Sequence, residues 1–219
     1  MKIAIEGHDY VGKTVVANRL AEMGYDKLIQ PGNKHIRAFI KEELQKDKVD
    51  ETMMTLAYAL DRHHMQSQLK GGDYIMDRSI YSSLIIQTDE VPVSIVAAAN
   101  DNLPMPDVVF WLRISEKELK RRMKDREEKD LYDTRAFQIK ERYDTLMPEF
   151  RRKSNANFHE IFCDKKSVDE IANEIHEILN SRVEINGAYF NPSWNETIRD
   201  IFGDDIKRYS EKFVKELLK

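Results

Sequence analysis

Short apolar runs alternate along this chain with longer segments in which apolar residues recur at every third or fourth position. A short, uniformly apolar run predicts a buried strand, and the longer spacing predicts a helix with one buried face. The strand-like runs cover residues 2–6, 26–30, 73–76, 108–114 and 158–163. The helix-like segments cover residues 14–23, 34–45, 50–70, 91–100, 137–150 and 167–178, with two more that begin near residues 80 and 115.

Strands that alternate with helices predict an α/β fold, here a parallel sheet of about five strands with helices on both faces. Residues that end or cap helices support the same division of the chain. Gly71-Gly72 ends one helix, and Ser115 with Glu118, like Ser167 with Glu170, has the spacing of an N-terminal capping box. In such sheets ligands bind beyond the C-terminal ends of the strands. We therefore expect the functional residues in the loops that follow the strands.

The pattern divides the chain into a predicted α/β domain over residues 1–180 and a helical extension of unknown role over residues 181–219. Within the extension one predicted helical stripe contains Ile206, Tyr209, Phe213 and Leu217. Amphipathic helices usually bury their apolar face against their own domain, which is the favoured interpretation. A contact in a homodimer is the alternative.

Composition narrows the class of protein. The chain is 41% apolar and 34% charged, which suits a folded domain with a well-solvated surface. A net charge of -4 gives no general affinity for nucleic acid. Cys163 is the only cysteine, so no internal disulfide can form, as expected in a reducing compartment. Because the first predicted strand begins at Lys2, we expect no signal peptide, and no apolar run reaches the roughly 18 residues of a membrane span. We expect a cytoplasmic protein that binds neither membranes nor nucleic acid.

One segment carries the strongest functional signal, because it fits G-x-x-x-x-G-K-[ST], the pattern of a phosphate-binding loop. The segment is Gly7-His8-Asp9-Tyr10-Val11-Gly12-Lys13-Thr14. It lies between a predicted strand and a predicted helix, which is the context that this loop requires. The predicted parallel sheet is therefore of the P-loop NTPase type, with the basic run described below as its expected lid. The glycines let backbone N–H groups converge on phosphate oxygens, and the helix N-terminus adds partial positive charge. We expect all eight residues to bind the phosphates of ATP, with Lys13 as a catalytic cation and the Thr14 hydroxyl as a ligand of Mg²⁺.

Asp77 and Arg78 follow the third predicted strand, whose end should lie near the phosphate-binding loop. An arginine there can bridge the donor and acceptor phosphates and stabilise the charge of the transferred group. Asp77 is the second expected ligand of Mg²⁺. The alternative is that Asp77 and Arg78 only pair with each other, but a nearby phosphate loop favours the functional interpretation.

Two further groups of residues leave both a structural and a functional interpretation open. A basic run after the fourth predicted strand contains Arg121, Arg122, Lys124 and Arg126. Such runs are usually solvated helix faces, but one that leads into a loop is also typical of a lid over a nucleotide. Tyr58 and Arg62 lie one helical turn apart and are best explained as a local packing pair, although an aromatic ring beside a cation can also bind a base.

Taken together, these segments resemble the thymidylate kinases, nucleoside monophosphate kinases that transfer the γ-phosphoryl group of ATP to dTMP. The resemblance runs in order from about residue 2 to residue 179. It rests on Glu6 to Thr14, Leu56 to Arg62, Asp77 to Ser83, Pro106-Asp107, and the basic lid followed by Phe137, Arg142 and Tyr143. It implies that Asp9 accepts a hydrogen bond from the sugar 3′-OH, that Tyr58 stacks on thymine and that Arg62 contacts the edge of the base. It also implies that Ser83 faces the base and that Arg78 binds the acceptor phosphate.

The chain departs from this family in its phosphate loop and in its length. Some members carry an arginine within the loop, where this chain has Tyr10-Val11. We therefore expect Arg122 and Arg126, one turn apart in the predicted lid, to supply the positive charge at the transition state. The extension after Ser181 also exceeds the usual length of the family.

Two departures lie near the expected acceptor site. The turn Gln30 to Asn33 lacks the charged residue that is usual there, and Lys34 or Arg37 can substitute for it. Ile86 stands where an aromatic residue commonly crowds the sugar C2′, which leaves open how well ribonucleotides are excluded.

Other functions compete with the favoured one. A deoxynucleoside kinase needs a carboxylate base after the second strand to deprotonate a sugar hydroxyl, and this chain has Gln30 there. A nucleotide-dependent switch would exchange or hydrolyse nucleotide without passing phosphate to a small acceptor. A metal site at His63 and His64 is disfavoured, because adjacent side chains diverge by about 100° around a helix.

Overall fold

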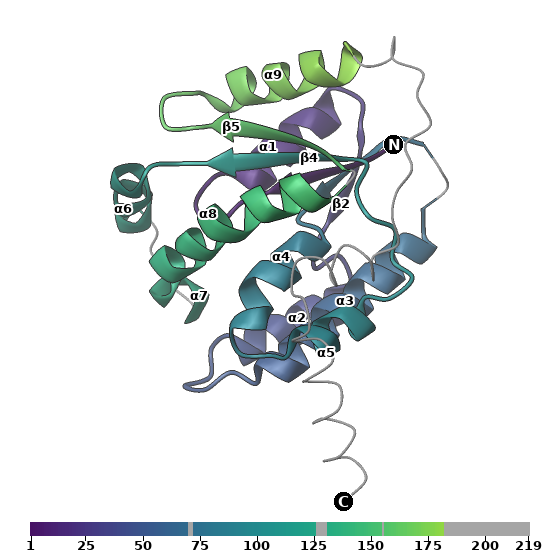
Figure 1. Ribbon diagram of the computed structural model, residues 1–219, viewed down its shortest axis with the longest axis vertical. Helices are drawn as coiled ribbons and strands as arrows, with labels where there is room; N and C mark the ends of the chain where they lie inside the picture. The colour runs from purple at the N-terminus through teal and green to yellow at the C-terminus, as the bar shows by residue number, and fades with distance from the viewer. Residues whose placement is uncertain (70–71, 126–130, 155, 182–219) are drawn as a thin grey trace, which may run out of the picture.

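The computed structural model describes residues 1–69, 72–125, 131–154 and 156–181. Within this part of the chain the strands form one five-stranded parallel sheet in the order β2-β3-β1-β4-β5 (Figure 1). The strands are β1 (Lys2–Glu6), β2 (Asp26–Ile29), β3 (Tyr74–Asp77), β4 (Val108–Arg113) and β5 (Asn157–Phe162). The predicted α/β fold with a parallel sheet is thus confirmed.

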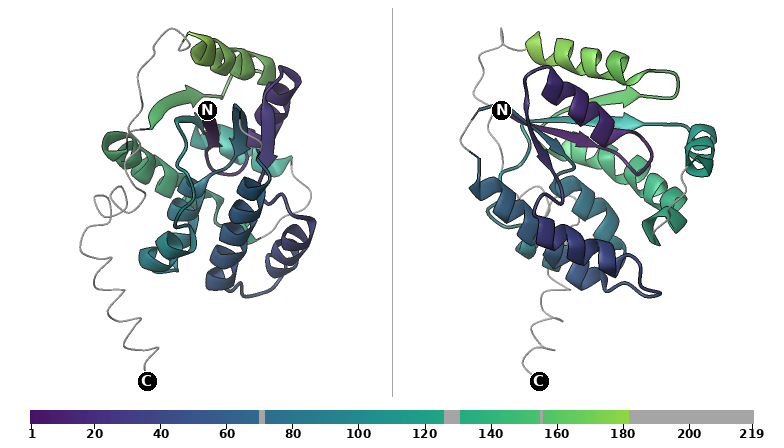
Figure 2. Two further views of the ribbon diagram at one scale, coloured as in Figure 1. Left: turned by 90° about the vertical axis from the view of Figure 1, so that its right-hand side faces the viewer. Right: turned by 180° about the vertical axis from the view of Figure 1, so that it is seen from behind.

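Helices cover both faces of the sheet, as Figures 1 and 2 show. One face carries α1 (Lys13–Glu22) and α9 (Val168–Asn180), which contact each other. The opposite side carries α2 (Lys34–Glu43), α3 (Glu51–Ser67), α4 (Ile80–Ile86) with the 3₁₀ turn η1 (Gln87–Asp89), α5 (Val93–Ala99) and α8 (Ala136–Lys153). The short helices α6 (Glu116–Lys124) and α7 (Leu131–Thr134) complete the set of described helices. Among the described residues, none of these helices combines the length and the apolar character that crossing a membrane requires.

The apolar strands are explained by burial on both faces of the sheet. Successive side chains of a strand point to opposite sides, so Ile3 and Ile5 pack with α1 and α9, whereas Ala4 packs with α4 and α8. A parallel sheet covered on both faces needs apolar residues at every position, which explains the uninterrupted run in β4.

The parallel order of the strands also brings the predicted functional segments together. β1 and β3 are neighbours, and Ile5 lies opposite Asp77 in their register. The segments that follow these two strands therefore leave the sheet side by side. This places the phosphate loop, which follows β1, next to Asp77 and Arg78 at the end of β3.

Two local predictions were wrong in detail. The Ser115 Oγ accepts from the Glu118 N–H, but the return bond of the predicted capping box is replaced, because the Ser115 N–H donates to Asp164. In α8, Phe137 is exposed although it was placed on the apolar side with Ile139. Two residues correspond to about 200° around a helix, so these two side chains point in nearly opposite directions.

Some predictions fall outside the described residues. The predicted role of Arg126 concerns a residue outside the described part of the chain. The predicted helical extension, residues 181–219, also lies outside it except for its first residue. The boundary at residue 180 and the packing of the extension therefore stay predictions. The last described helix, α9, ends at Asn180.

Candidate active site

The phosphate loop connects β1 to α1 and depends on backbone conformations that glycine favours. Gly7 has φ of 144°, and a Cβ at this position would lie 2.6 Å from the Leu112 carbonyl oxygen. Gly12 has φ of 96° and is the N-cap of α1. Tyr10 adopts φ of 70°, which is uncommon for a residue with a side chain. Its hydroxyl donates to Asp133 of α7 over 2.6 Å, so α7 contacts the loop directly.

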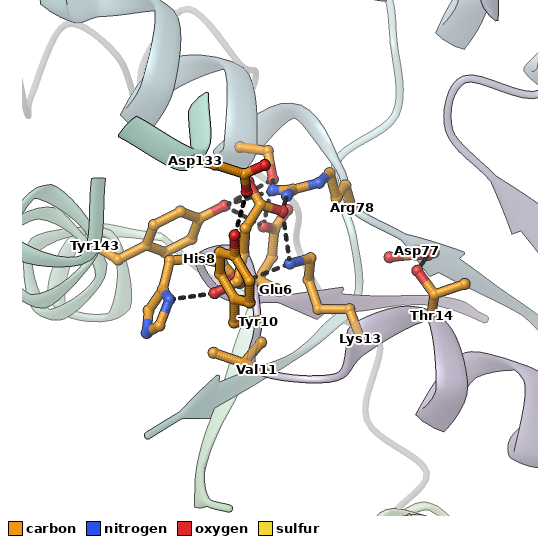
Figure 3. A network of polar contacts seen from close by, with 12 residues as sticks. Glu6, His8, Tyr10, Val11, Lys13, Thr14, Asp77, Arg78, Asp133 and Tyr143 are labelled. Carbon is orange, nitrogen blue, oxygen red and sulfur yellow. Dashed lines mark hydrogen bonds and ion pairs between the residues drawn. The ribbon is translucent and has the colours of Figure 1, made fainter. Parts of the chain in front are cut away.

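Lys13 is buried at the start of α1 and folds back over the loop (Figure 3). Its Nζ donates to the His8 carbonyl over 2.7 Å and lies 3.8 Å from the Asp9 carboxylate. Burial, and then the positive charge of Arg78, lower the pKa of Lys13 to about 8. This makes the Lys13 charge costly unless an anion lies nearby, as expected of a group that binds phosphate.

Thr14 and Asp77 lie together at the edge of the loop. The Thr14 Oγ1 donates to the Asp77 Oδ2 over 2.5 Å. A hydroxyl and a carboxylate are hard oxygen ligands of the type that Mg²⁺ prefers. Among the described residues no three His, Cys, Asp or Glu side chains form a metal cluster. These residues therefore fit a Mg²⁺ ion that is held mainly by phosphates and water, with one or two protein ligands.

Arg78 extends from the end of β3 to the other side of the loop (Figure 3). Its Nη2 donates to the Asp9 carboxylate, and its Nη1 faces the hydroxyls of Ser82 and Tyr143 at 3.3 and 3.4 Å. Burial opposes the Arg78 charge, but Asp9 and other nearby anionic groups outweigh this effect and raise the pKa of Arg78. Asp77 and Arg78 thus have different partners, Thr14 and Asp9, and the alternative in which they only pair with each other does not hold.

A cavity of about 200 Å³ opens beside Arg78. All five predicted substrate-binding residues line it, namely Asp9, Tyr58, Arg62, Arg78 and Ser83. They come from four separate places in the chain: the phosphate loop, α3, the end of β3 and α4. The remaining lining residues are Gln30, Pro31, Leu44, Ser82, Ile86, Gln87 and Tyr132.

Arg62 is the buried cation at the inner wall of this cavity. Its Nη2 donates to the Ser83 Oγ over 2.7 Å, and its Nε donates to the Asn100 Oδ1 over 2.9 Å. Burial lowers the pKa of Arg62 to about 10, so it stays charged at neutral pH. These bonds tie Arg62 to α4 and to the end of α5, which explains it better than a packing pair with Tyr58.

The sequence interpretation missed several residues of the cavity wall. Gln87 is buried, and its Oε1 has no hydrogen-bond partner among the described residues. Tyr132 reaches the cavity from α7 and donates to Glu51 over 3.1 Å. Asn100, the C-cap of α5, lies behind the wall and orients Arg62. For Gln87 a signal existed, since it lies four residues after Ser83, but nothing local marks Tyr132 or Asn100.

Arg122, a predicted lid residue, binds the outer side of the phosphate loop. Its Nη1 donates to the carbonyls of Tyr10 and Val11 at 2.9 and 3.2 Å, and its Nη2 donates to the Cys163 carbonyl at 3.3 Å. Glu118, one turn earlier in α6, accepts from Nε at 2.7 Å. These bonds hold the loop against the end of β5.

The turn after β2 is fixed by Asp61 of α3, whose carboxylate accepts from the N–H groups of Gly32 and Asn33 at 2.8 to 2.9 Å. A Cβ on Gly32 would lie 2.2 Å from the Met65 Sδ and 2.8 Å from the Ile29 carbonyl oxygen. Of the two predicted substitute cations, Arg37 donates to the Pro31 carbonyl at 2.8 Å, whereas Lys34 is exposed at the start of α2.

His8 is a buried residue of the loop that has no assigned chemistry. Its Nδ1 lies 2.6 Å from the Asp9 carbonyl oxygen and therefore donates, which leaves Nε2 as an acceptor without a partner among the described residues. Burial, and then the charge of Lys13, lower the pKa of His8 to about 4. His8 is thus neutral at physiological pH.

Comparisons with known proteins agree with this geometry. The family model described as "Thymidylate kinase" matches residues 5–175. A protein of Methanococcus maripaludis strain S2 named "Probable thymidylate kinase" is 31% identical over 192 residues, covering 83% of this chain and 94% of that protein. A protein of Sulfurisphaera tokodaii with the same name is 32% identical over 137 residues, covering 56% of this chain and 69% of that protein.

Solved structures support the fold independently. The thymidylate kinase of Candida albicans aligns with a TM-score of 0.66 at 19% identity, covering 86% of this chain and 96% of that chain. The thymidylate kinase of Ehrlichia chaffeensis aligns with a TM-score of 0.58 at 19% identity, covering 82% and 98%. At this identity the likeness concerns the fold alone.

Proposed function

The chain belongs to the thymidylate kinase family, and from that premise we propose how its residues bind ATP and dTMP. It is an ATP-dependent phosphotransferase, a nucleoside monophosphate kinase that transfers the γ-phosphoryl group of ATP to dTMP and yields dTDP. In our proposal the phosphate loop binds ATP, the cavity lined by Tyr58 and Arg62 binds dTMP, and Arg78 lies between the two.

The observation that carries the proposal is the convergence of a phosphate loop, a half-buried arginine and an open cavity at the ends of two adjacent strands. Arg78 borders both the loop, through Asp9, and the cavity. A monophosphate bound in the cavity with its phosphate toward Arg78 would present an acceptor oxygen to the ATP held by the loop. Such an acceptor is already anionic and needs no general base.

For the nucleoside part of dTMP, we assign stacking on the base to Tyr58 and contact with the base edge to Arg62 and Ser83. Arg62 is anchored by two hydrogen bonds, so it is oriented before substrate binds. The buried Gln87 Oε1 is a further acceptor at the cavity, suited to an N–H of the base. Asp9 is assigned to the sugar 3′-OH. Ile86 lines the cavity and shapes the space around the sugar.

We assign Thr14 and Asp77 to a Mg²⁺ ion that accompanies ATP. When bound, this ion neutralises charge on the β- and γ-phosphates. The protein supplies the remaining positive charge through Lys13 and Arg78 and, in our proposal, through Arg126 of the lid. In this structure Arg122 donates hydrogen bonds to the loop carbonyls of Tyr10 and Val11. While these bonds are formed, Arg122 supports the loop that binds ATP and does not contact the transferred phosphoryl group directly.

A nucleoside kinase is not favoured. Gln30 lines the cavity at the position where such an enzyme needs its carboxylate base. The carboxylate that does line the cavity, Asp9, already accepts a hydrogen bond from Arg78 in an ion pair. A nucleotide switch would have no use for a second cavity beside its phosphate loop.

We also propose that two copies of the chain form a homodimer through α3. Met53, Leu56 and Leu60 recur on one stripe of this helix and are 46%, 46% and 60% exposed. A contiguous apolar stripe on a rigid helix is a typical contact between copies, because a twofold axis lets it pack on itself. Leu60→Glu should shift the sedimentation coefficient from dimer to monomer, whereas Val168→Glu on α9 should not. A wild-type monomer at micromolar concentration would refute the dimer.

The kinase activity is tested with a panel of acceptors and Mg·ATP. We expect dTMP to be phosphorylated at least about a hundredfold faster in kcat/KM than thymidine, or about 2.7 kcal/mol at the barrier. Arg78→Ala should reduce the use of dTMP far more than that of thymidine, since only dTMP carries the phosphate. Arg19→Ala, on the opposite face of the sheet, is the matched control. A preference for thymidine, or ATP hydrolysis that ignores every acceptor, would refute the assignment.

A further inference from the structure

Glu6 is a buried carboxylate that the chemistry described so far does not use. It is the last residue of β1, directly before the phosphate loop, and it is 0% exposed. A buried carboxylate is costly unless hydrogen bonds compensate it, and here four donor groups do so. The Oε1 atom accepts from the Ser79 N–H at 2.7 Å and from the Ser79 Oγ at 2.6 Å. The Oε2 atom accepts from the Ser82 Oγ at 2.7 Å and from the Tyr143 hydroxyl at 3.1 Å.

All of these donors surround Arg78. Ser79 follows Arg78 in the chain, and Ser82 and Tyr143 carry the hydroxyls that its Nη1 faces. Figure 3 shows Glu6, Arg78 and Tyr143 together. Glu6 therefore holds Arg78 at both ends. At the backbone, it binds the N–H that follows a residue with φ of 74°, a left-handed conformation that is uncommon outside glycine. At the guanidinium, Glu6 accepts hydrogen bonds from the hydroxyls of Ser82 and Tyr143, which in turn accept from the Arg78 Nη1.

The hydroxyl protons of Ser82 and Tyr143 explain why a carboxylate, which only accepts hydrogen bonds, is needed at position 6 to orient Arg78. The hydroxyls of Ser82 and Tyr143 have one proton each and lie 2.8 Å apart. The Ser82 proton goes to Glu6, and the Tyr143 proton goes to Glu6 or to Ser82. Both hydroxyl protons are therefore used within this triangle, and both oxygens present lone pairs to Arg78.

We propose that Glu6 is a positioning residue that fixes Arg78 toward the acceptor phosphate by accepting the protons of Ser79, Ser82 and Tyr143. The inference rests on the role given above to Arg78 in binding that phosphate. It adds a direct coupling between β1, which leads into the ATP-binding loop, and the acceptor site.

Glu6→Gln tests the proposal because a glutamine fits the same space but cannot accept all four hydrogen bonds in either orientation of its amide. With its NH₂ toward Ser79, it opposes the backbone N–H, which cannot reorient. With its NH₂ toward Ser82 and Tyr143, it donates to those hydroxyls, and at least one O–H must then turn toward Arg78. We expect kcat/KM for dTMP to fall at least about tenfold, while the dissociation constant of ATP changes less than about threefold.

A double-mutant cycle separates positioning from general damage to the fold. If Glu6 acts through Arg78, the Glu6→Gln change should cost less than about twofold in an Arg78→Ala background, although it costs tenfold in the wild type. Glu43→Gln is the matched control, since Glu43 is also a buried glutamate but pairs with Lys46 in the turn that follows α2. An equal loss in both backgrounds would overturn the proposal.

Two further measurements keep the outcome decisive. If Glu6→Gln does not fold, Tyr143→Phe and Ser82→Ala each remove one acceptor of Arg78 and enter the same cycle, with the same criterion. The ¹⁵N guanidinium signals of Arg78, assigned by their loss in Arg78→Lys, should be restrained in the wild type and averaged in Glu6→Gln. This signal does not depend on the acceptor. Unchanged guanidinium signals would refute the positioning, whereas failure of dTMP as acceptor would refute only the proposed substrate.

Discussion

Lys13 should take up a proton when ATP binds at mildly alkaline pH. In the nucleotide-free protein its pKa lies near 8 instead of 10.5, because the ammonium group is buried and faces Arg78. The difference corresponds to a cost of about 3 kcal/mol for holding the charge in the nucleotide-free loop. Phosphates at the loop remove this cost, so the pKa of Lys13 rises towards its ordinary value on binding and the missing fraction of the proton is taken up.

The size of the effect follows from the titration of a single group. With a pKa near 8, free Lys13 lacks about 0.1 proton at pH 7, about 0.5 at pH 8 and about 0.9 at pH 9. Binding of ATP should restore this fraction, so the affinity for ATP should fall by up to about tenfold per pH unit above pH 8. ATP itself adds little, because its terminal phosphate is fully ionised well above a pKa of about 6.

Isothermal titration calorimetry measures the uptake directly. Titrations of Mg·ATP in two buffers of different ionisation enthalpy give the number of protons exchanged at each pH. Lys13→Arg is the control, because a guanidinium stays charged throughout this range and should exchange none. Wild-type protein that takes up less than about 0.1 proton at pH 9, or a Lys13→Arg variant that takes up as much, would contradict this account of the loop.

Three further predictions concern the lid, His8 and the turn after β2. If the lid supplies the transition-state charge, Arg126→Ala should lower kcat by roughly 10³ or more with little change in the KM for dTMP. Arg122→Ala, which releases the loop carbonyls, should also weaken ATP binding. Losses of kcat under about tenfold in both variants and in the double variant would show that the cation comes from another residue. In the unfolded chain His8 is protonated below about pH 6.5, whereas in the folded protein it is protonated only near pH 4. The free energy of unfolding should therefore fall by up to about 3 kcal/mol as the pH drops from 6.5 to 4. Urea titrations should show this fall in the wild type and not in His8→Asn. Gly32→Ala should raise the KM for dTMP because its Cβ meets Met65 and the Ile29 carbonyl, and Met65→Ala should recover part of the loss only if the side-chain contact dominates.

Much of the fold was determined by local features of the sequence. The apolar runs predicted the strands, because a strand buried on both faces must be apolar throughout. The phosphate loop was equally readable, since its glycines, Lys13 and Thr14 act within eight consecutive residues and are held by the backbone that they form. Ser167 and Glu170 form the predicted capping box for the same reason, as both partners lie within one helical turn.

The tertiary structure decided which distant residues meet. The Thr14 hydroxyl donates to Asp77 because β1 lies beside β3 in the sheet. Glu6 accepts hydrogen bonds from Ser82 of α4 and Tyr143 of α8 because these two helices pack together on one face of the sheet. Neither the spacing of apolar residues nor any single segment contains that order of strands. The same is true of the cavity wall, where Arg62 of α3 is oriented by Asn100 at the end of α5.

Exposure was decided in the same way. The stripe of α3 that contains Leu60 has the periodicity of a buried face, yet α3 turns its other side, with Arg62, toward the cavity. Periodicity fixes which side chains share a face of a helix, but the rotation of the helix depends on everything packed around it. The sequence therefore determined the elements and the phosphate loop, whereas packing determined which buried charges pair and which apolar side faces solvent.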